Sequence, residues 1–508
     1  MIIKLQSPPA AQTESTIALL WEKPENAKEI SAYNIYMDDK LQGICTATDH
    51  TVTELADDKE YEFYIEAVLH NGRTGGRSNS IRVTTKSVCE HFDITSYGAV
   101  GDGRTVNTAA IQKAIHACTK GGKVYIPRGI FVTGAIFLKS NMTLYLEEGS
   151  LLLGSPEIKD YPLYRYRFEG LETMCYASLL NTEDMDRERL CNITIDGPGK
   201  IDANGNLLRQ QELKEGLGKP GRALAIRNCD NLYLKDITVR QSPAWCVHLI
   251  YCNQVSINNI KIHTKRNEGG EKYGNIANGD GLDPDSTSNV YIFHSTIASQ
   301  DDCIAIKSGR DREGREAGIP SENYRVTNCT FLSGFGVAIG SEMAGGVRNV
   351  LVQDCFFQDV YSIGSVKAPR GRGGVVENIK YENIVFSNYS REHEDGRWFR
   401  GAIYIDQFYS HQEFDALKEE EVNEGTPLIR DITFKDIILD TIAGNAIYLT
   451  GLPESPLCNI ILENINAIGK YGLKANNIRG LITQNVSITA REGGARELKN
   501  VVDGLEML

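Results

Sequence analysis

The segment Asn231-Leu-Tyr-Leu-Lys-Asp-Ile-Thr-Val239 decides the fold of this chain, because its pattern returns many times along the sequence. Each copy places a polar residue, most often asparagine, before three mostly apolar residues, and most copies continue with a polar pair and an apolar pair. The copies in register begin at Asn192, Asn231, Gln254, Asn289, Asn323, Asn349, Asn378 and Asn459. Several steps between starts lie between about 23 and 35 residues, which is the period of a solenoid.

Short β-branched runs separated by turns, without a helical pattern, make this repeat a β-solenoid. We expect each coil to turn its valines and isoleucines inward. Asparagine tolerates the left-handed backbone region, and its side chain forms local hydrogen bonds. The corner asparagines are therefore expected to bond from coil to coil. The predicted second domain covers residues 90–508.

The stretch Asn107–Cys118 reads as an amphipathic helix, with Asn107 able to cap its start and two glycines after its end. Its apolar residues share one face, which holds Ile111, Ala114, Ile115 and Cys118. A helix followed by strands suits an end cap over the first coil.

Residues 1–86 have a different texture, with short alternating strands separated by turn signals, as in a β-sandwich. The spacing Leu55-x5-Tyr61-x-Phe63 resembles the tyrosine corner of a fibronectin type III domain, with Trp21 as its core tryptophan. A carbohydrate-binding module is one interpretation. We favour a spacer that packs on the second domain, because no row of exposed aromatic residues is evident.

The length of 508 residues indicates two or more units. A formal net charge of −13 argues against a nucleic-acid partner, because phosphate binding needs a basic face. No run of about 20 apolar residues predicts a membrane span. The first residues lack the apolar core of a signal peptide, so we expect a cytoplasmic protein, or else a secreted or periplasmic one whose leader has been removed.

Twelve cysteines are present, but none form a Cys-x-x-Cys pair, so we expect no zinc or redox site and no cofactor. Cys329 and Cys355 occupy the same slot in successive repeats. They are expected to be buried, stacked thiols that act as small apolar residues.

Two motifs place acids on an otherwise β-branched stack: Asn278-Gly-Asp280 and Gln300-Asp301-Asp302. Asp280 and Asp301 are separated by about one coil, and neighbouring coils lie about 4.8 Å apart. Crowded carboxylates repel one another, so at least one should have a raised pKa. A protonated carboxyl beside carboxylates that polarise a water is the arrangement that glycoside cleavage needs. An alternative is that the acids only bind calcium or cap turns.

With these motifs the second domain resembles glycoside hydrolase family 28, the polygalacturonases. The flanking segments Asp283–Val290 and Gly340–Gly346 match as well. The resemblance implies a right-handed parallel β-helix that hydrolyses α-1,4-galacturonosidic bonds of polygalacturonate or oligogalacturonides. It also implies that Asp301 is the general acid and that Asp280 and Asp302 hold the hydrolytic water. Such enzymes invert the anomeric configuration, which implies an acid–base separation of about 6.5–9.5 Å.

Two positions depart from the family pattern. The family's Gly-His-Gly, whose histidine contacts the catalytic acid, appears as Gly334-Phe335-Gly336. A phenyl ring cannot hydrogen-bond, but it can desolvate Asp301 and favour its protonated form. The family's Arg-Ile-Lys, which binds substrate carboxylates, appears as Ser365-Val366-Lys367.

The resemblance also implies substrate contacts from Asn278, Lys367 and Tyr409. Arg370 and Arg372 are close enough in sequence to replace the missing arginine, since a guanidinium fork suits a uronate. They could equally belong to a solvated loop. Trp245 is expected to fill a corner of the coil, and stacking on a sugar is the alternative.

Residues 388–426 interrupt the repeat, and insertions in a solenoid often lie on the binding face. Such a loop could wall off the cleft, so we expect attack at chain ends. The missing arginine leaves a rhamnogalacturonan or substituted-galacturonan hydrolase open. A pectate lyase and a non-catalytic polysaccharide-binding solenoid are the alternatives of other classes. The oligomeric state is not predicted.

Overall fold

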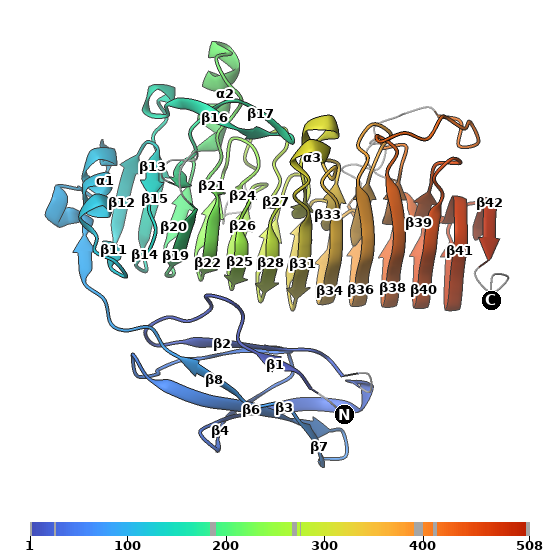
Figure 1. The fold of residues 1–508 in the computed structure, drawn as a ribbon, viewed down its shortest axis with the longest axis horizontal. Coiled ribbons are helices and arrows are strands. Elements are labelled where there is room, and N and C mark those ends of the chain that lie inside the picture. The colour runs from blue at the N-terminus through green and yellow to red at the C-terminus, as the bar shows by residue number, and fades with distance from the viewer. Residues whose placement is uncertain are drawn as a thin grey trace.

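A computed structural model describes residues 3–24, 27–182, 189–266, 272–274, 276–390, 400–409 and 414–503. The chain forms a small sandwich followed by a long parallel β-helix, whose coils run side by side from the helix α1 (Thr108–Ala117) to the C-terminal strand β42 (Arg496–Asp503) (Figure 1). None of the described helices is long and apolar enough to cross a membrane.

The sandwich has two antiparallel sheets packed around a buried Trp21. One sheet holds β1 (Leu5–Gln6), β2 (Ile17–Trp21) and β5 (Asp49–Val52), and the other holds β3 (Ile30–Met37), β4 (Lys40–Cys45), β6 (Glu60–Leu69), β7 (Thr74–Arg77) and β8 (Ile81–Thr84). The Tyr61 hydroxyl accepts a hydrogen bond of 2.8 Å from the backbone N–H of Ala56. The tyrosine corner predicted from the sequence is thus confirmed.

The β-helix is built from three rows of parallel strands. The row that carries the site, which we call the site face, holds β13 (Ile136–Leu138), β18 (Leu180–Thr182), β21 (Leu224–Arg227), β24 (Val247–Ile250), β27 (Leu282–Asp285), β30 (Ile304–Ile306), β33 (Val337–Gly340), β35 (Gly364–Lys367), β37 (Gly401–Asp406), β39 (Asn445–Thr450) and the start of β41 (Tyr471–Ala490). The second row holds β9 (His91–Asp93), β11 (Lys123–Ile126), β14 (Met142–Leu146), β19 (Leu190–Asp196), β22 (Cys229–Lys235), β25 (Asn253–Asn258), β28 (Ser288–Phe293), β31 (Ser321–Thr327), β34 (Val347–Gln358), β36 (Val375–Asn388), β38 (Leu428–Thr441) and β40 (Leu457–Gly469). The third row holds β10 (Asp102–Val106), β12 (Gly129–Thr133), β15 (Ser150–Gly154), β20 (Lys200–Asp202), β23 (Thr238–Arg240), β26 (Lys261–His263), β29 (Thr296–Ala298) and β32 (Thr330–Ser333), and the far ends of β34, β36, β38 and β40 continue it.

The corner residues behave as the sequence predicts. All eight of the predicted repeat starts have φ between 53° and 63°, in the left-handed region (Asn192, Asn231, Gln254, Asn289, Asn323, Asn349, Asn378 and Asn459). Asparagine amides also bond between coils, for example Asn349 to Asn323 at 3.0 Å and Asn378 to Asn349 at 2.8 Å. The ladder satisfies polar groups at each corner and fixes the register of the stack.

The interior of the coils is one continuous apolar core of valine, isoleucine, leucine and phenylalanine. Cys329 and Cys355 are buried in it, which confirms the predicted stacked thiols. Helix α1 covers the first coil with Ile111, Ala114 and Ile115 buried. The predicted cap at Asn107 is wrong: its side chain bonds instead to the backbone of Val100 and Thr105, so the preceding loop uses its amide.

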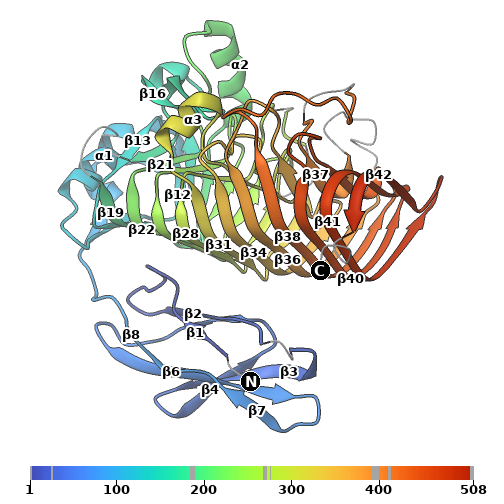
Figure 2. The same ribbon diagram turned by 45° about the vertical axis from the view of Figure 1, so that its right-hand side comes forward.

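The sandwich packs along the β-helix on the side away from the helices α2 (Gly205–Glu215) and α3 (Asp311–Ala317) (Figures 1 and 2). Strand β2 is buried on both faces, because Ile17, Leu19 and Trp21 enter the sandwich core while Ala18 and Leu20 pack against the coils. The sandwich thus packs on the second domain, and its role as a spacer stays a prediction.

A hairpin made of β16 (Leu163–Phe168) and β17 (Leu171–Tyr176) leaves the stack between β15 and β18. It lies with α2 and α3 at the side of the molecule opposite to the sandwich (Figure 1). Three short 3-10 turns complete the described elements, at Ala27–Glu29, Ile94–Tyr97 and Ile158–Asp160.

Candidate active site

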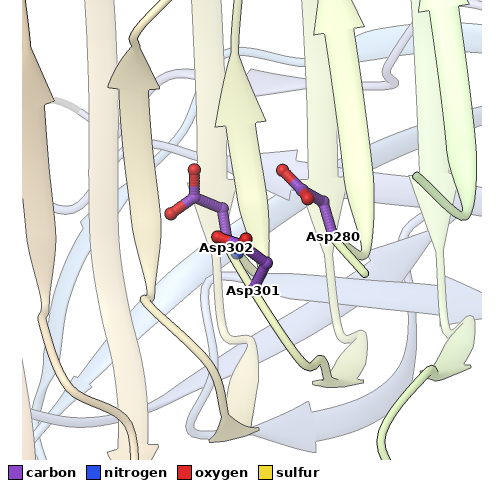
Figure 3. Close-up of side chains that lie close together, drawn as sticks. All are labelled: Asp280, Asp301 and Asp302. Atoms are coloured by element: carbon purple, nitrogen blue, oxygen red, sulfur yellow. Dashed lines mark hydrogen bonds between the residues drawn. The ribbon is translucent and has the colours of Figure 1, made fainter. Parts of the chain in front are cut away.

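The three aspartates singled out from the sequence meet on the site face. Asp280 precedes β27, and Asp301 and Asp302 precede the neighbouring strand β30 (Figure 3). Leu282 pairs with Ile304, so Asp280 lies opposite Asp302 in the register, one residue away from the expected partner Asp301. The nearest carboxylate oxygens of all three lie within 4.8 Å of one another. Coil stacking thus brings the two motifs together.

The expected acid–base separation of about 6.5–9.5 Å joins whole carboxyl groups, whereas the bound of 4.8 Å joins one oxygen of each acid. The expected separation therefore stays a prediction.

Burial and mutual repulsion raise the pKa values of this cluster. Burial, then the charges of Asp283 and Asp301, raise the pKa of Asp280 well above its ordinary value. Burial also raises the pKa of Asp283, to about 8. Burial raises the pKa of Asp302 too, and the Lys367 ammonium opposes this shift. Burial and mutual repulsion thus favour the protonated forms of Asp280, Asp283 and Asp302.

Two buried lysines hold the acids in place. Lys367 Nζ forms an ion pair with Asp302 and lies 5.4 Å from the centre of the Tyr409 ring. Lys307 Nζ lies 3.0 Å from Glu342 Oε2 and 3.7 Å from Asp283 Oδ1. Gly340 is the register neighbour of Lys367, and a Cβ at Gly340 would lie 2.3 Å from the Lys367 carbonyl oxygen, so this position needs a glycine.

The acids open into a cleft of about 510 Å³. Its lining includes the predicted residues Asn278, Asp280, Asp301, Asp302, Lys367, Arg372 and Tyr409, together with the two departures Phe335 and Ser365. Arg372 also pairs with Asp311 and donates to the Ser341 carbonyl at 2.7 Å. One of the two candidate arginines therefore reaches the cleft.

Arg370 is not among the residues that line the cleft. Its guanidinium forms a bidentate pair with Glu454, at 2.6 and 2.9 Å, and donates to the Lys418 carbonyl. Lys418 belongs to the predicted insertion, so this part of it folds onto Arg370, whereas Tyr404 and Tyr409 of the same stretch line the cleft. Part of the insertion, residues 391–399 and 410–413, lies outside the described residues.

Steric space explains why residue 334, before Phe335, is a glycine. Gly334 has a φ of 98°, and a Cβ there would lie 2.2 Å from the carbonyl oxygen of Asp301. The close approach lets the Phe335 N–H donate to that carbonyl at 3.0 Å, which fixes the backbone beneath the acid pair. The Phe335 ring lines the cleft.

Trp245 fills a buried corner, as expected, with 1% of its surface exposed, and one edge also reaches the cleft. Its ring stacks on Phe168 of the hairpin, with centroids 5.8 Å apart. Arg167 of the same hairpin bonds to Asp285 of β27 at 2.9 Å. At the hairpin tip, the Gly170 carbonyl accepts from the Arg310 N–H at 3.3 Å. The hairpin therefore covers the site face on the N-terminal side of the acids.

Sequence reasoning missed several residues that shape the cleft: Glu169, Lys307, Arg310, Ser341, Glu342 and Tyr404. Burial alone would raise the pKa of Glu342, but Lys307 and Arg372 outweigh it and lower that pKa to about 2. Lys307 follows the acid pair by one short strand, and a lysine at the end of an otherwise apolar run is a signal that could have found it. Glu169 and Arg310 had no such signal.

Comparison with known families gives the same assignment as the geometry. The model of Glycosyl hydrolases family 28 matches residues 168–487, which span the three aspartates and every residue that lines the cleft. The chain belongs to this family. A second family model, described as rhamnogalacturonase A/epimerase, pectate lyase-like, matches residues 91–149, and the fibronectin type III domain model matches residues 7–84.

Relatives of this family 28 glycoside hydrolase include an exo-poly-alpha-D-galacturonosidase of Dickeya chrysanthemi, 28% identical over 77% of this chain and 75% of the relative. An endo-polygalacturonase of Pectobacterium carotovorum is 27% identical over 73% of this chain and 86% of the relative. Among solved structures, the Yersinia enterocolitica family 28 exopolygalacturonase shares the fold over 99% of both chains, with a TM-score of 0.84 and 23% identity. The Thermotoga maritima exopolygalacturonase covers 78% of this chain and 92% of its own, with a TM-score of 0.63 and 25% identity.

Proposed function

We propose that this hydrolase releases galacturonate from the ends of polygalacturonate or oligogalacturonide chains. The observation that carries the proposal is the cluster of three aspartates beside cationic groups in one cleft. A polyanionic substrate would be repelled by a protein of net charge −13 unless cations lie at the site. Lys307, Arg310, Lys367 and Arg372 supply them.

In the proposed mechanism Asp301 protonates the leaving oxygen, while Asp280 and Asp302 hold and polarise the attacking water. Asp301 is the least buried of the three, so it is placed to reach a bound sugar chain. Lys367 stabilises the ionised form of Asp302, which suits a base. The cations then pair with substrate carboxylates, and the guanidinium of Arg372 can do so with two hydrogen bonds.

The stereochemical outcome depends on which group attacks the anomeric carbon. This site has three carboxylates where an inverting pair has two, so Asp280 and Asp302 can hold one water between them. Direct attack by that water inverts the anomeric carbon. We therefore propose that the first product is β-galacturonate, whereas attack by a carboxylate would give the α-anomer first.

Attack at chain ends follows from the hairpin. Tyr166 and Phe168 pack with Ala225 of β21 and Ile250 of β24 in a buried cluster, so the groove over these coils is filled. The cleft continues past Phe335, Ser365 and Tyr404 toward the later coils. Among the described residues, the hairpin fills the N-terminal side, so a substrate chain would enter from the C-terminal side with its end at the hairpin.

A second candidate, a rhamnogalacturonan hydrolase, is favoured by Ser365. Its hydroxyl is buried at the cleft and has no hydrogen-bond partner among the described residues. A neutral sugar hydroxyl would pair with it better than a uronate would, since no charge stands at this position.

The test compares the purified protein with Asp301→Asn on polygalacturonate and on rhamnogalacturonan, with products separated by chromatography. Early galacturonate monomer, reduced at least about 10²-fold in the variant, is the expected result. Proton NMR of the first-formed anomer checks inversion. Products from rhamnogalacturonan alone would favour the second candidate, and unsaturated products that absorb in the ultraviolet would indicate a lyase.

A further inference from the structure

A second basin lies at the C-terminal end of the site face, beyond the cleft. It has a volume of about 750 Å³, and strands β39, β41 and β42 form much of its lining. Its basic side chains are Arg400, Lys470, Lys474, Arg496 and Lys499, and its acidic side chains are Asp415, Glu492 and Glu497. Five basic groups against three acidic ones make this basin locally positive in an acidic protein.

Three cations of the basin, Lys474, Lys499 and Arg496, have fewer carboxylate partners than positive charges among the described residues. Lys474 and Lys499 share a single carboxylate, Glu497, at 3.3 and 3.8 Å. Within the described part of the chain, the exposed Arg496 side chain forms no hydrogen bond or ion pair. A surplus of solvent-accessible positive charge therefore faces the basin and can pair with an anionic ligand.

The basin and the cleft adjoin along one column of outward-facing residues. Tyr404 lines the cleft, and its register partner Tyr448 on the next coil lines the basin, with ring centroids 5.9 Å apart. The column continues through Lys474 to Glu497. From the strand that follows Asp302 to β41 there are five coil steps, which amount to about 24 Å at 4.8 Å each.

We propose that this basin binds the distal part of the polyuronate chain whose end is cut in the cleft. This inference rests on the proposed function and adds a binding site to it. A chain that enters from the C-terminal side has to pass over these coils, since the hairpin covers the other side. Arg496 and the two lysines pair with its carboxylates, and the Tyr471 ring, 42% exposed beside Lys470, offers a face for a pyranose ring.

The experiment uses the double variant Lys474→Gln/Arg496→Gln in the full chain. Its matched control is Arg104→Gln/Lys113→Gln, which removes two exposed positive charges at the opposite end of the stack. Substrates are trigalacturonate and an oligogalacturonate long enough to extend beyond about 24 Å from the cut bond. We expect KM for the long substrate to rise about fivefold in the basin variant at low salt, with KM for trigalacturonate and both values in the control unchanged.

Equal KM values for the long substrate in the basin variant and the wild type would overturn the inference. A second measurement separates this failure from failure of the proposed function. Calorimetric titration of the long oligogalacturonate into Asp301→Asn, with and without the two basin substitutions, measures binding without turnover. Weaker binding with the basin substitutions supports the site even if another sugar linkage is the one cut, and equal binding contradicts it.

Discussion

At the scale of a single residue, Lys367 both lines the cleft and influences the ionisation of Asp302. Its ammonium pairs with Asp302 and lies over the Tyr409 ring, all in the cleft lining. Burial favours the neutral acid, whereas the ammonium favours the carboxylate. After burial, Lys367 has the largest effect on the pKa of Asp302, and the charges of Asp301 and Lys307 have smaller effects.

Lys367→Met should move the acid limb of kcat/KM to higher pH. Without the ammonium, the pKa of Asp302 rises further above its ordinary value, so the base is ionised only at higher pH, by about one to three units. The measurement is a pH–rate profile on a short oligogalacturonide. Lys380→Met is the control, because Lys380 is 41% exposed on the outer side of a coil and pairs with Glu382. An unchanged acid limb in Lys367→Met would show that Asp302 is not the titrating base.

At the scale of elements, the hairpin β16–β17 decides where the cleft ends. It is attached through buried contacts: Phe168 on Trp245, Arg167 on Asp285, and the Arg222 guanidinium on the Arg167 carbonyl at 3.1 Å. These partners lie on three different coils, so the hairpin also ties the early coils to the site.

Phe168→Ala should loosen the hairpin and change the products. Loss of a buried phenyl ring costs about 3–5 kcal/mol of local packing, which is enough to populate an open hairpin. Di- and trigalacturonate should then appear early beside the monomer when polygalacturonate is digested. Met174→Ala on the same hairpin is the control, since this side chain is 46% exposed. Monomer as the only early product in a folded Phe168→Ala variant would contradict the role given to the hairpin.

At the scale of the whole molecule, the sandwich contacts the β-helix over many of its coils. Four polar contacts join the two domains. Lys86 donates a hydrogen bond to Thr194, and Arg325 donates one to the Trp21 carbonyl. Lys23 forms an ion pair with Asp354, and Lys28 forms one with Asp436. An apolar patch of Ala11, Ala18 and Leu20 against Tyr233 and Phe293 lies between them. The contacts span strands β19 to β38, so unfolding of the sandwich should affect many coils.

Leu20→Asp should separate the unfolding of the two domains. Leu20 points out of the sandwich core toward the coils, so the substitution buries an unpaired carboxylate only at the interface. We expect a lower first melting temperature and two calorimetric transitions in place of one. Ile44→Asp is the matched control, because Ile44 is 63% exposed on the sandwich. A single transition at the wild-type temperature in Leu20→Asp would show that the interface contributes little to stability.

The sequence by itself determined what depends on short-range order. Corner asparagines with β-branched runs specify coils, and acids spaced by about one coil must then stack, so the fold and the triad Asp280, Asp301 and Asp302 could be predicted. Register between adjacent coils follows from the repeat, because a slip of one residue would turn the apolar side chains outward.

Only the tertiary structure decided which groups outside the repeat reach the site. Arg370 and Arg372 are two residues apart, yet one pairs with Glu454 and the other lines the cleft, because the loop after β35 turns between them. Asp302 and Lys367 meet across 65 residues, and the hairpin closes a cleft built by later coils. Such contacts depend on the way in which long loops fold back onto the β-helix, and no local sequence pattern encodes this.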